Sequence, residues 1–79
     1  QEILSPFTHN LLVDYPRLTP SELQIANLIR QGKSSKEISD ELGLSARTVE
    51  THRRNMRAKL GIKDKKINLR SYLVTNKYT

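Results

Sequence analysis

The chain has 79 residues and no cysteine, so we expect one small domain without disulfides or thiolate metal sites. Its net charge is +6, and no apolar run approaches the length needed to cross a membrane. Because the first residue is Gln1 rather than methionine, we expect a piece of a longer protein.

The excess positive charge is confined to residues 47–66. This quarter of the chain holds eight basic and two acidic residues, whereas the rest holds six of each sign. A solvated helix face normally mixes both signs. The segregation therefore indicates a polyanionic partner such as a nucleic acid.

The first predicted helix lies between the N-capping Ser5 and Pro16. Phe7, Leu11 and Tyr15 recur in it at a spacing of four, which places them on one helix face. Such an apolar stripe must be covered, either by the rest of the domain or by a second copy of the chain.

Two capping motifs predict the next two helices. In TPSE, residues 19–22, the threonine caps the helix and the glutamate reaches back to the cap N–H; Gly32 ends this helix. SSKE, residues 34–37, repeats the motif before a short helix that ends at Gly43.

The most basic helix is predicted over residues 46–60, after the N-capping Ser45 and before a glycine. Its apolar positions, Val49, Met56 and Leu60, are seven and four residues apart and form one inward face.

A last helix is predicted after Asp64 as its N-cap, with Ile67, Leu69, Tyr72 and Leu73 on its apolar side. These side chains are expected in the core, with an exposed dimer surface as the alternative. The fold class is therefore all-α, with four helices and an additional N-terminal one.

Ser39, Gly43 and Val49 stand at the offsets of a helix-turn-helix. This motif needs a small residue where the second helix passes over the first, a turn glycine with positive φ, and an apolar residue that fixes the crossing angle. Its second helix lies in the major groove of DNA, with its N-terminal half against the base edges.

Helical phase then turns Glu50, Thr51 and Arg54 outward as candidate base contacts. Arginine pairs with guanine, glutamate accepts from the cytosine amino group, and the threonine methyl group suits thymine. An alternative for Glu50 is a simple ion pair with Arg54 one turn away. Other basic and hydroxyl side chains are expected to reach phosphates. These are Lys33, Ser34, Ser35, Lys36, Ser45, Arg47, Thr48, His52, Arg53, Arg57 and Lys59.

No enzymatic site is predicted. The two histidines, His9 and His52, are isolated in the sequence, and no paired carboxylates accompany them. This leaves nothing for acid–base or metal chemistry, so we expect no cofactor and no metal.

The run LTPSELQIANLIRQGKSSKEISDELGLSARTVETHRRNMRAKLGI, residues 18–62, resembles the C-terminal DNA-binding domain of the LuxR/GerE family of bacterial transcription regulators. The resemblance implies a four-helix domain that binds promoter or operator DNA in the cytoplasm, at the nucleoid. It also carries over Glu50, Thr51 and Arg54 as groove-facing residues. Many members have a lysine or a neutral residue in place of Glu50, so the target bases cannot be taken from relatives.

The stretch IKDKKINLRSYL is similar to a subgroup whose upstream sensor is a PAS-type domain. It implies that residues 1–16 form a connecting helix and residues 17–79 the helix-turn-helix domain. The resemblance also implies a homodimer on DNA, with RNA polymerase as a further candidate partner. The candidate dimer contacts are Leu69 and Leu73 in the last helix, or Phe7, Leu11 and Tyr15 in the first.

Two other functions stay open at this point. A sigma-factor-like promoter-recognition domain has the same local helix-turn-helix but needs a polymerase partner. A basic helical module that binds an acidic protein would show no preference among DNA duplexes.

Overall fold

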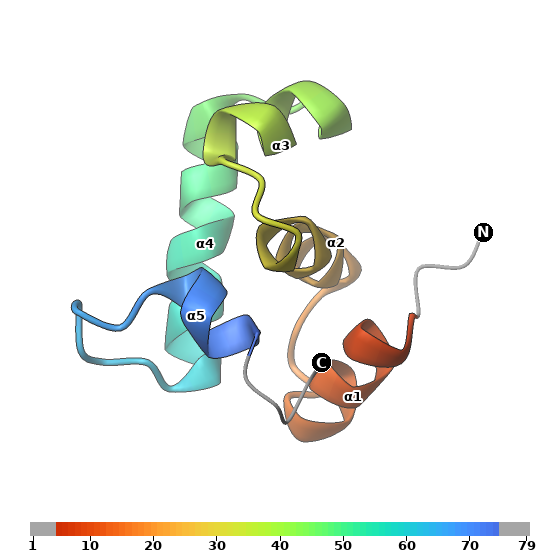
Figure 1. Cartoon of the computed structure of the whole chain (residues 1–79), viewed down its shortest axis with the longest axis vertical. Helices are drawn as coiled ribbons and strands as arrows, with labels where there is room; N and C mark the ends of the chain where they lie inside the picture. Colours follow the sequence, from red (N-terminus) through yellow and green to blue (C-terminus); the bar gives the residue numbers. More distant parts are fainter. Residues whose placement is uncertain (1–4, 75–79) are drawn as a thin grey trace.

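The computed structural model describes residues 5–74, which form five helices and no strand (Figure 1). The predicted all-α fold class is confirmed. Within this range, no helix has the length and apolar character that a bilayer crossing requires. The outer ends of the predicted segments 1–16 and 17–79 lie outside the described residues. The helices are α1 (Pro6–Asp14), α2 (Pro20–Arg30), α3 (Ser35–Leu42), α4 (Ala46–Leu60) and α5 (Leu69–Leu73).

The first four helices begin at the predicted N-caps. Each capping side chain accepts a hydrogen bond from the backbone N–H three residues later, which satisfies one of the free donors of the first turn. In α2 and α3 a glutamate at the third helical position completes a capping box, accepting the N–H of the cap at 2.8 Å in both helices. The four caps are Ser5, Thr19, Ser34 and Ser45.

The last helix begins later than predicted, because Asn68 and not Asp64 is its N-cap. The Asn68 side chain accepts the N–H of Ser71 at 3.2 Å. Asp64 Oδ1 instead accepts the N–H of Lys66 at 2.9 Å, a local turn that competes with helix formation. Ile67, predicted on the apolar side of the helix, consequently precedes it and is 41% exposed.

Helix α2 lies in the middle of the molecule and packs against each of the other four helices (Figure 1). The inward face predicted for α4 is confirmed, since Val49 and Met56 are fully buried and Leu60 is nearly so. Burying a side chain of this size contributes roughly 1.5–3 kcal/mol of hydrophobic stabilisation. The apolar residues that α2 adds to this core are Leu23, Ile25, Ala26, Leu28 and Ile29.

The apolar stripe of α1 is covered by the domain itself. Phe7 and Leu11 are buried in the same core as α2, and the Arg30 guanidinium lies 4.7 Å from the centroid of the Phe7 ring. At the end of α1, the hydroxyl groups of Tyr15 and Tyr72 share a hydrogen bond of 2.5 Å. Burial first, and then this bond and the nearby charges, raise the pKa of Tyr72 to about 12.

Four of the five apolar residues proposed for a dimer are buried within one chain, and the fifth, Tyr15, is half-buried. Leu69 and Leu73 of α5 are buried, as are Phe7 and Leu11 of α1, so the surfaces predicted to meet a second chain already pack within one chain. A dimer through either helix would have to use its other, exposed residues.

Candidate nucleic-acid interface

The turn between α3 and α4 has the backbone that a helix-turn-helix requires. Gly43 adopts φ +68°, and a Cβ there would meet nothing within 4 Å, so the turn demands a backbone conformation rather than space. The N–H groups of Gly43 and Leu44 both bond the carbonyl of Ser39. Ser39 itself is buried where α3 packs on α4, and Val49 is buried on the α4 side.

The outer face of α4 presents polar side chains to solvent. Arg47, Glu50 and Arg54 are exposed, and Thr51 is half-buried with its hydroxyl donating to the Arg47 carbonyl at 3.1 Å. Arg54 has no hydrogen-bond or ion-pair partner among the described residues. Its guanidinium is therefore available to a ligand without breaking any contact within the protein.

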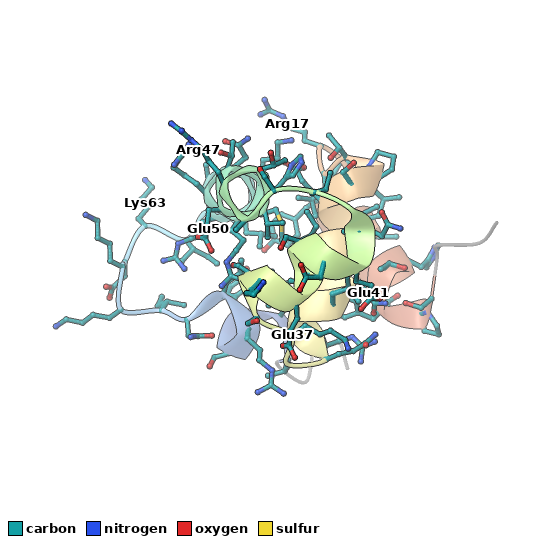
Figure 2. All side chains as sticks on the ribbon, turned by 90° about the horizontal axis from the view of Figure 1, so that it is seen from above. Arg17, Glu37, Glu41, Arg47, Glu50 and Lys63 are labelled. Atoms are coloured by element: carbon teal, nitrogen blue, oxygen red, sulfur yellow. The ribbon has the colours of Figure 1, made fainter. Side chains whose placement is uncertain are left out.

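Glu50 is held by α3 rather than by its own helix. Its carboxylate accepts a hydrogen bond from the hydroxyl of Ser35, at the start of α3. In Figure 2, Glu50 lies on the side of α4 that faces α3. No ion pair joins Glu50 to Arg54 in residues 5–74, so the structure does not form the alternative pair. This contact across the helix-turn-helix was not anticipated from the sequence, because it joins positions 15 residues apart.

Two cations predicted to reach phosphates already have partners within the protein. Arg57 donates from Nη1 to the Ile67 carbonyl at 2.8 Å and from Nη2 to the Asp64 carbonyl at 3.0 Å. Lys59 Nζ lies 2.8 Å from Oε1 of Glu22, whose side chain is only 3% exposed. Both side chains stabilise the domain, because α2 and the α4–α5 loop (residues 61–68) supply acceptors within their reach.

Burial alone would raise the pKa of Glu22, but the hydrogen bonds from Lys59 and from Thr19 outweigh it and lower that pKa below its ordinary value. The pKa of Glu37 is also lowered, by the N–H and then the hydroxyl of Ser34. Both carboxylates are therefore favoured in the charged form in the folded chain.

Among the other predicted phosphate contacts, the cationic side chains stay accessible, whereas the hydroxyl groups of Ser35 and Ser45 donate to Glu50 and Thr48. Lys33 and Lys36 form ion pairs with Glu41 and Asp40 at 3.7 and 3.6 Å, and exposed pairs of this kind contribute little. The hydroxyl of Ser45 bonds that of Thr48 at 2.9 Å in the first turn of α4. No partner within the described part of the chain occupies the side chains of Arg47, His52 or Arg53.

Two residues of the α4–α5 loop, Lys63 and Lys65, were not predicted from the sequence as site residues. With α4 they line an open depression of about 510 Å³. Both lysines belong to the basic run over residues 47–66. Because the last helix was predicted to begin after Asp64, this segment was not expected to form a loop beside α4. We call this feature the basic depression; it is lined by Glu50, Arg53, Arg54, Arg57, Ala58, Ile62, Lys63 and Lys65.

Comparison with known proteins agrees with this geometry. Residues 16–70 match the family described as "Bacterial regulatory proteins, luxR family". The transcriptional regulatory protein MctR of Rhizobium johnstonii is 53% identical over 45 residues, which are 57% of this chain and 21% of MctR. The transcriptional regulatory protein UhpA of Escherichia coli is 51% identical over 45 residues, which are 57% of this chain and 23% of UhpA.

The transcriptional regulatory protein LiaR of Bacillus subtilis is 38% identical over a longer stretch of 66 residues, which are 81% of this chain and 31% of LiaR. The chain thus spans less than a third of the length of each of these relatives. No solved structure matches it. The chain belongs to the luxR family of bacterial regulatory proteins, and its α3–turn–α4 unit is a helix-turn-helix.

Proposed function

We propose that the chain reads specific base pairs of double-stranded DNA, with the N-terminal half of α4 in the major groove. The observation that carries this proposal is Arg54, which is exposed and has no partner in the described residues. It is one turn from Thr51, on the face opposite the buried Val49 and Met56. The guanidinium can pair with guanine in a bidentate manner, while the threonine methyl group can contact thymine.

Glu50 adds a chemical preference that a purely basic face lacks. A carboxylate repels phosphates, and it accepts a hydrogen bond from the amino group of cytosine. Because the Ser35 hydroxyl bonds Oε2 of Glu50, the carboxylate has a fixed position before DNA arrives and its other oxygen can face a base. Ser35 is thus a positioning residue in this proposal, in addition to its predicted phosphate contact.

The phosphates on either side of the groove are bound by the remaining candidates. Exposed ammonium and guanidinium groups supply most of this affinity, and it falls as salt rises because counterions are released. Hydroxyl and N–H groups in the first turns of α3 and α4 add contacts that fix the register on the duplex. The set is Lys33, Ser34, Ser35, Lys36, Ser45, Arg47, Thr48, His52 and Arg53.

We further propose that the chain acts as a homodimer on DNA, within a longer cytoplasmic regulator at the nucleoid. A single domain of this size buries little DNA surface, so strong binding needs two copies on half-sites about one helical turn apart. RNA polymerase is the proposed downstream partner. Residues 1–16 are the proposed connection to an upstream sensor of the PAS type, which the resemblance of the last segment favours.

Selection of bound duplexes from a random pool, without polymerase, tests this proposal. We expect one enriched motif arranged as two half-sites about 10 base pairs apart. Equal binding to all duplexes would contradict base reading and favour a basic module for an acidic partner. Enrichment that appears only when polymerase is added would favour a sigma-factor-like domain. Full affinity for a single half-site would contradict the dimer alone.

A further inference from the structure

The α4–α5 loop, residues 61–68, is held beside α4 by hydrogen bonds. The guanidinium of Arg57 bonds two of its carbonyls, those of Asp64 and Ile67. The N–H of Ile67 bonds the Asp64 carbonyl at 3.1 Å, and Ile62 is buried at the start of the loop. In Figure 1 this loop projects from the lower end of α4 before the chain returns to α5.

The charge of this loop is not neutralised within the domain. Lys63, Lys65 and Lys66 are all exposed, and none forms an ion pair in the part of the chain that the structure describes. The only acidic residue of the loop, Asp64, uses its carboxylate to accept the N–H of Lys66. In Figure 2, Lys63 extends on the same side of the molecule as Arg47 of α4, whereas Glu37 and Glu41 lie on α3.

The basic depression combines this charge with a floor of small and apolar groups. Lys63 and Lys65 line it from the loop, and Arg53, Arg54 and Arg57 line it from α4. Ala58 and Ile62 also contribute to its lining. The carboxylate of Glu50, at the same depression, is bonded by Ser35 and so is held toward α3. A cationic concavity with apolar groups in its lining fits a phosphate together with its attached sugar.

We propose that the basic depression binds one phosphodiester group of the DNA backbone, flanking the bases that α4 reads. Lys63, Lys65 and Arg53 bind the phosphate oxygens, and Ala58 leaves room for the deoxyribose. Arg57 positions the loop through its two carbonyl bonds. The site rests on the proposed DNA binding and borders the base contacts, since Glu50 and Arg54 also line the depression. The loop lysines add affinity and orientation rather than sequence preference, because a phosphate carries no sequence information.

The test replaces both lining lysines, Lys63→Gln with Lys65→Gln, and compares Lys66→Gln, a loop lysine that does not line the depression. For the double variant we expect a roughly five- to tenfold weaker affinity at 0.1 M salt and a salt slope smaller by about 0.9, as for one lost phosphate contact. The loss should be equal on the selected site and on random DNA. The Lys66 variant should bind within about twofold of the parent chain.

A scan with neutral methylphosphonate linkages locates the phosphate. At one linkage in each half-site, the neutral substitution should weaken binding of the parent chain. The same substitution should not weaken binding of the double variant any further. A second variant, Ala58→Leu, fills the depression without changing its charge. It should lose as much DNA affinity as the double variant, and the neutral linkage should not weaken its binding further.

Three results would overturn the site. One is the absence of any linkage at which the parent chain, but not the double variant, loses affinity. The others are an unchanged affinity of the Ala58→Leu variant and a loss for Lys66→Gln as large as that of the double variant. In each of these the parent chain still selects its preferred duplex. Absence of any preferred duplex for the parent chain would instead contradict the proposed base reading, so the two failures are distinguishable.

Discussion

The two parts of α4 are both basic but use their charge in different ways. Arg53 and Arg54, in residues 46–54, have no partner among the described residues. Arg57 and Lys59, in residues 55–60, bond loop carbonyls and a buried carboxylate. The difference arises from what lies alongside, since the second part meets α2 and the α4–α5 loop, whereas the outer face of the first meets solvent.

A run of basic residues in a sequence can therefore serve two functions at once. One function is attraction of a polyanion, which depends on cations that keep their charge accessible. The other is assembly of the fold, in which Lys59 pairs with the buried carboxylate of Glu22 and Arg57 bonds two carbonyls of the loop. Mutations that remove the same charge from each part of α4 should therefore have opposite signatures.

The largest effect is expected for Lys59→Met, which keeps the apolar stem and removes the charge. Glu22 would then be left buried and without its ion-pair partner. We expect a loss of about 2–3 kcal/mol in the free energy of unfolding, measured in urea at pH 7, because a buried charge without its partner is costly. Adding Glu22→Gln, which can keep the capping box, should recover most of the stability. An unchanged urea midpoint would contradict a structural role for this pair.

The opposite signature is expected for Arg54→Ala. Affinity for the selected duplex should fall by roughly 1–3 kcal/mol, with little change on random DNA, because a bidentate contact with guanine is lost. Its free energy of unfolding should stay within about 0.5 kcal/mol of the parent chain, since Arg54 makes no contact that folding needs. Arg17→Ala, on the exposed α1–α2 turn, is the matched control and should change neither quantity. An equal loss of affinity for the selected and the random duplex would indicate that Arg54 contacts a phosphate rather than a base.

Acid should weaken the stabilisation that the pair of Glu22 and Lys59 gives to the fold. The pKa of Glu22 is lower in the folded chain than its ordinary value of 4.5, so the carboxylate stabilises the fold above that pH. This stability should decline as the pH falls below 4.5 and through the lowered pKa. The loss should be smaller than that of Lys59→Met at pH 7, because protonated Glu22 can still accept hydrogen bonds. Urea unfolding between pH 3 and pH 7 measures it, and Glu22→Gln should flatten this part of the curve.

Local chemistry explains why most of the fold could be predicted from the sequence. The capping serine and threonine residues and the glycines after α3 and α4 act within one turn, and their effect can be read without knowing the tertiary structure. Asp64 shows where prediction of helix ends from residue type fails. It is a good cap by residue type, but its carboxylate bonds the N–H of Lys66, and Asn68 starts the helix instead.

The candidate site was predictable where helical phase decides exposure, as for Arg54 and the buried Val49. It was not predictable where long-range contacts decide which polar groups are engaged. Lys59 bonds a residue 37 positions away, and Ser35 bonds Glu50 across the helix-turn-helix. Neither the pairing nor the cationic lining contributed by the α4–α5 loop follows from the spacing of charges alone.

The smallest effect is expected for Ser35→Ala, which tests whether the outer face of α4 is itself preorganised. Without the hydroxyl, the carboxylate of Glu50 becomes mobile, and discrimination at the base pair it reads should fall by about two- to fivefold, consistent with one hydrogen bond of roughly 0.5–1 kcal/mol. Binding to random duplexes at matched salt measures the loss of phosphate contact that the same change can cause. Ser35→Ala in a Glu50→Gln background should cause no further loss of discrimination if Ser35 acts through the carboxylate. A drop that is equal on every duplex, and unchanged in the Glu50→Gln background, would instead assign Ser35 to a phosphate.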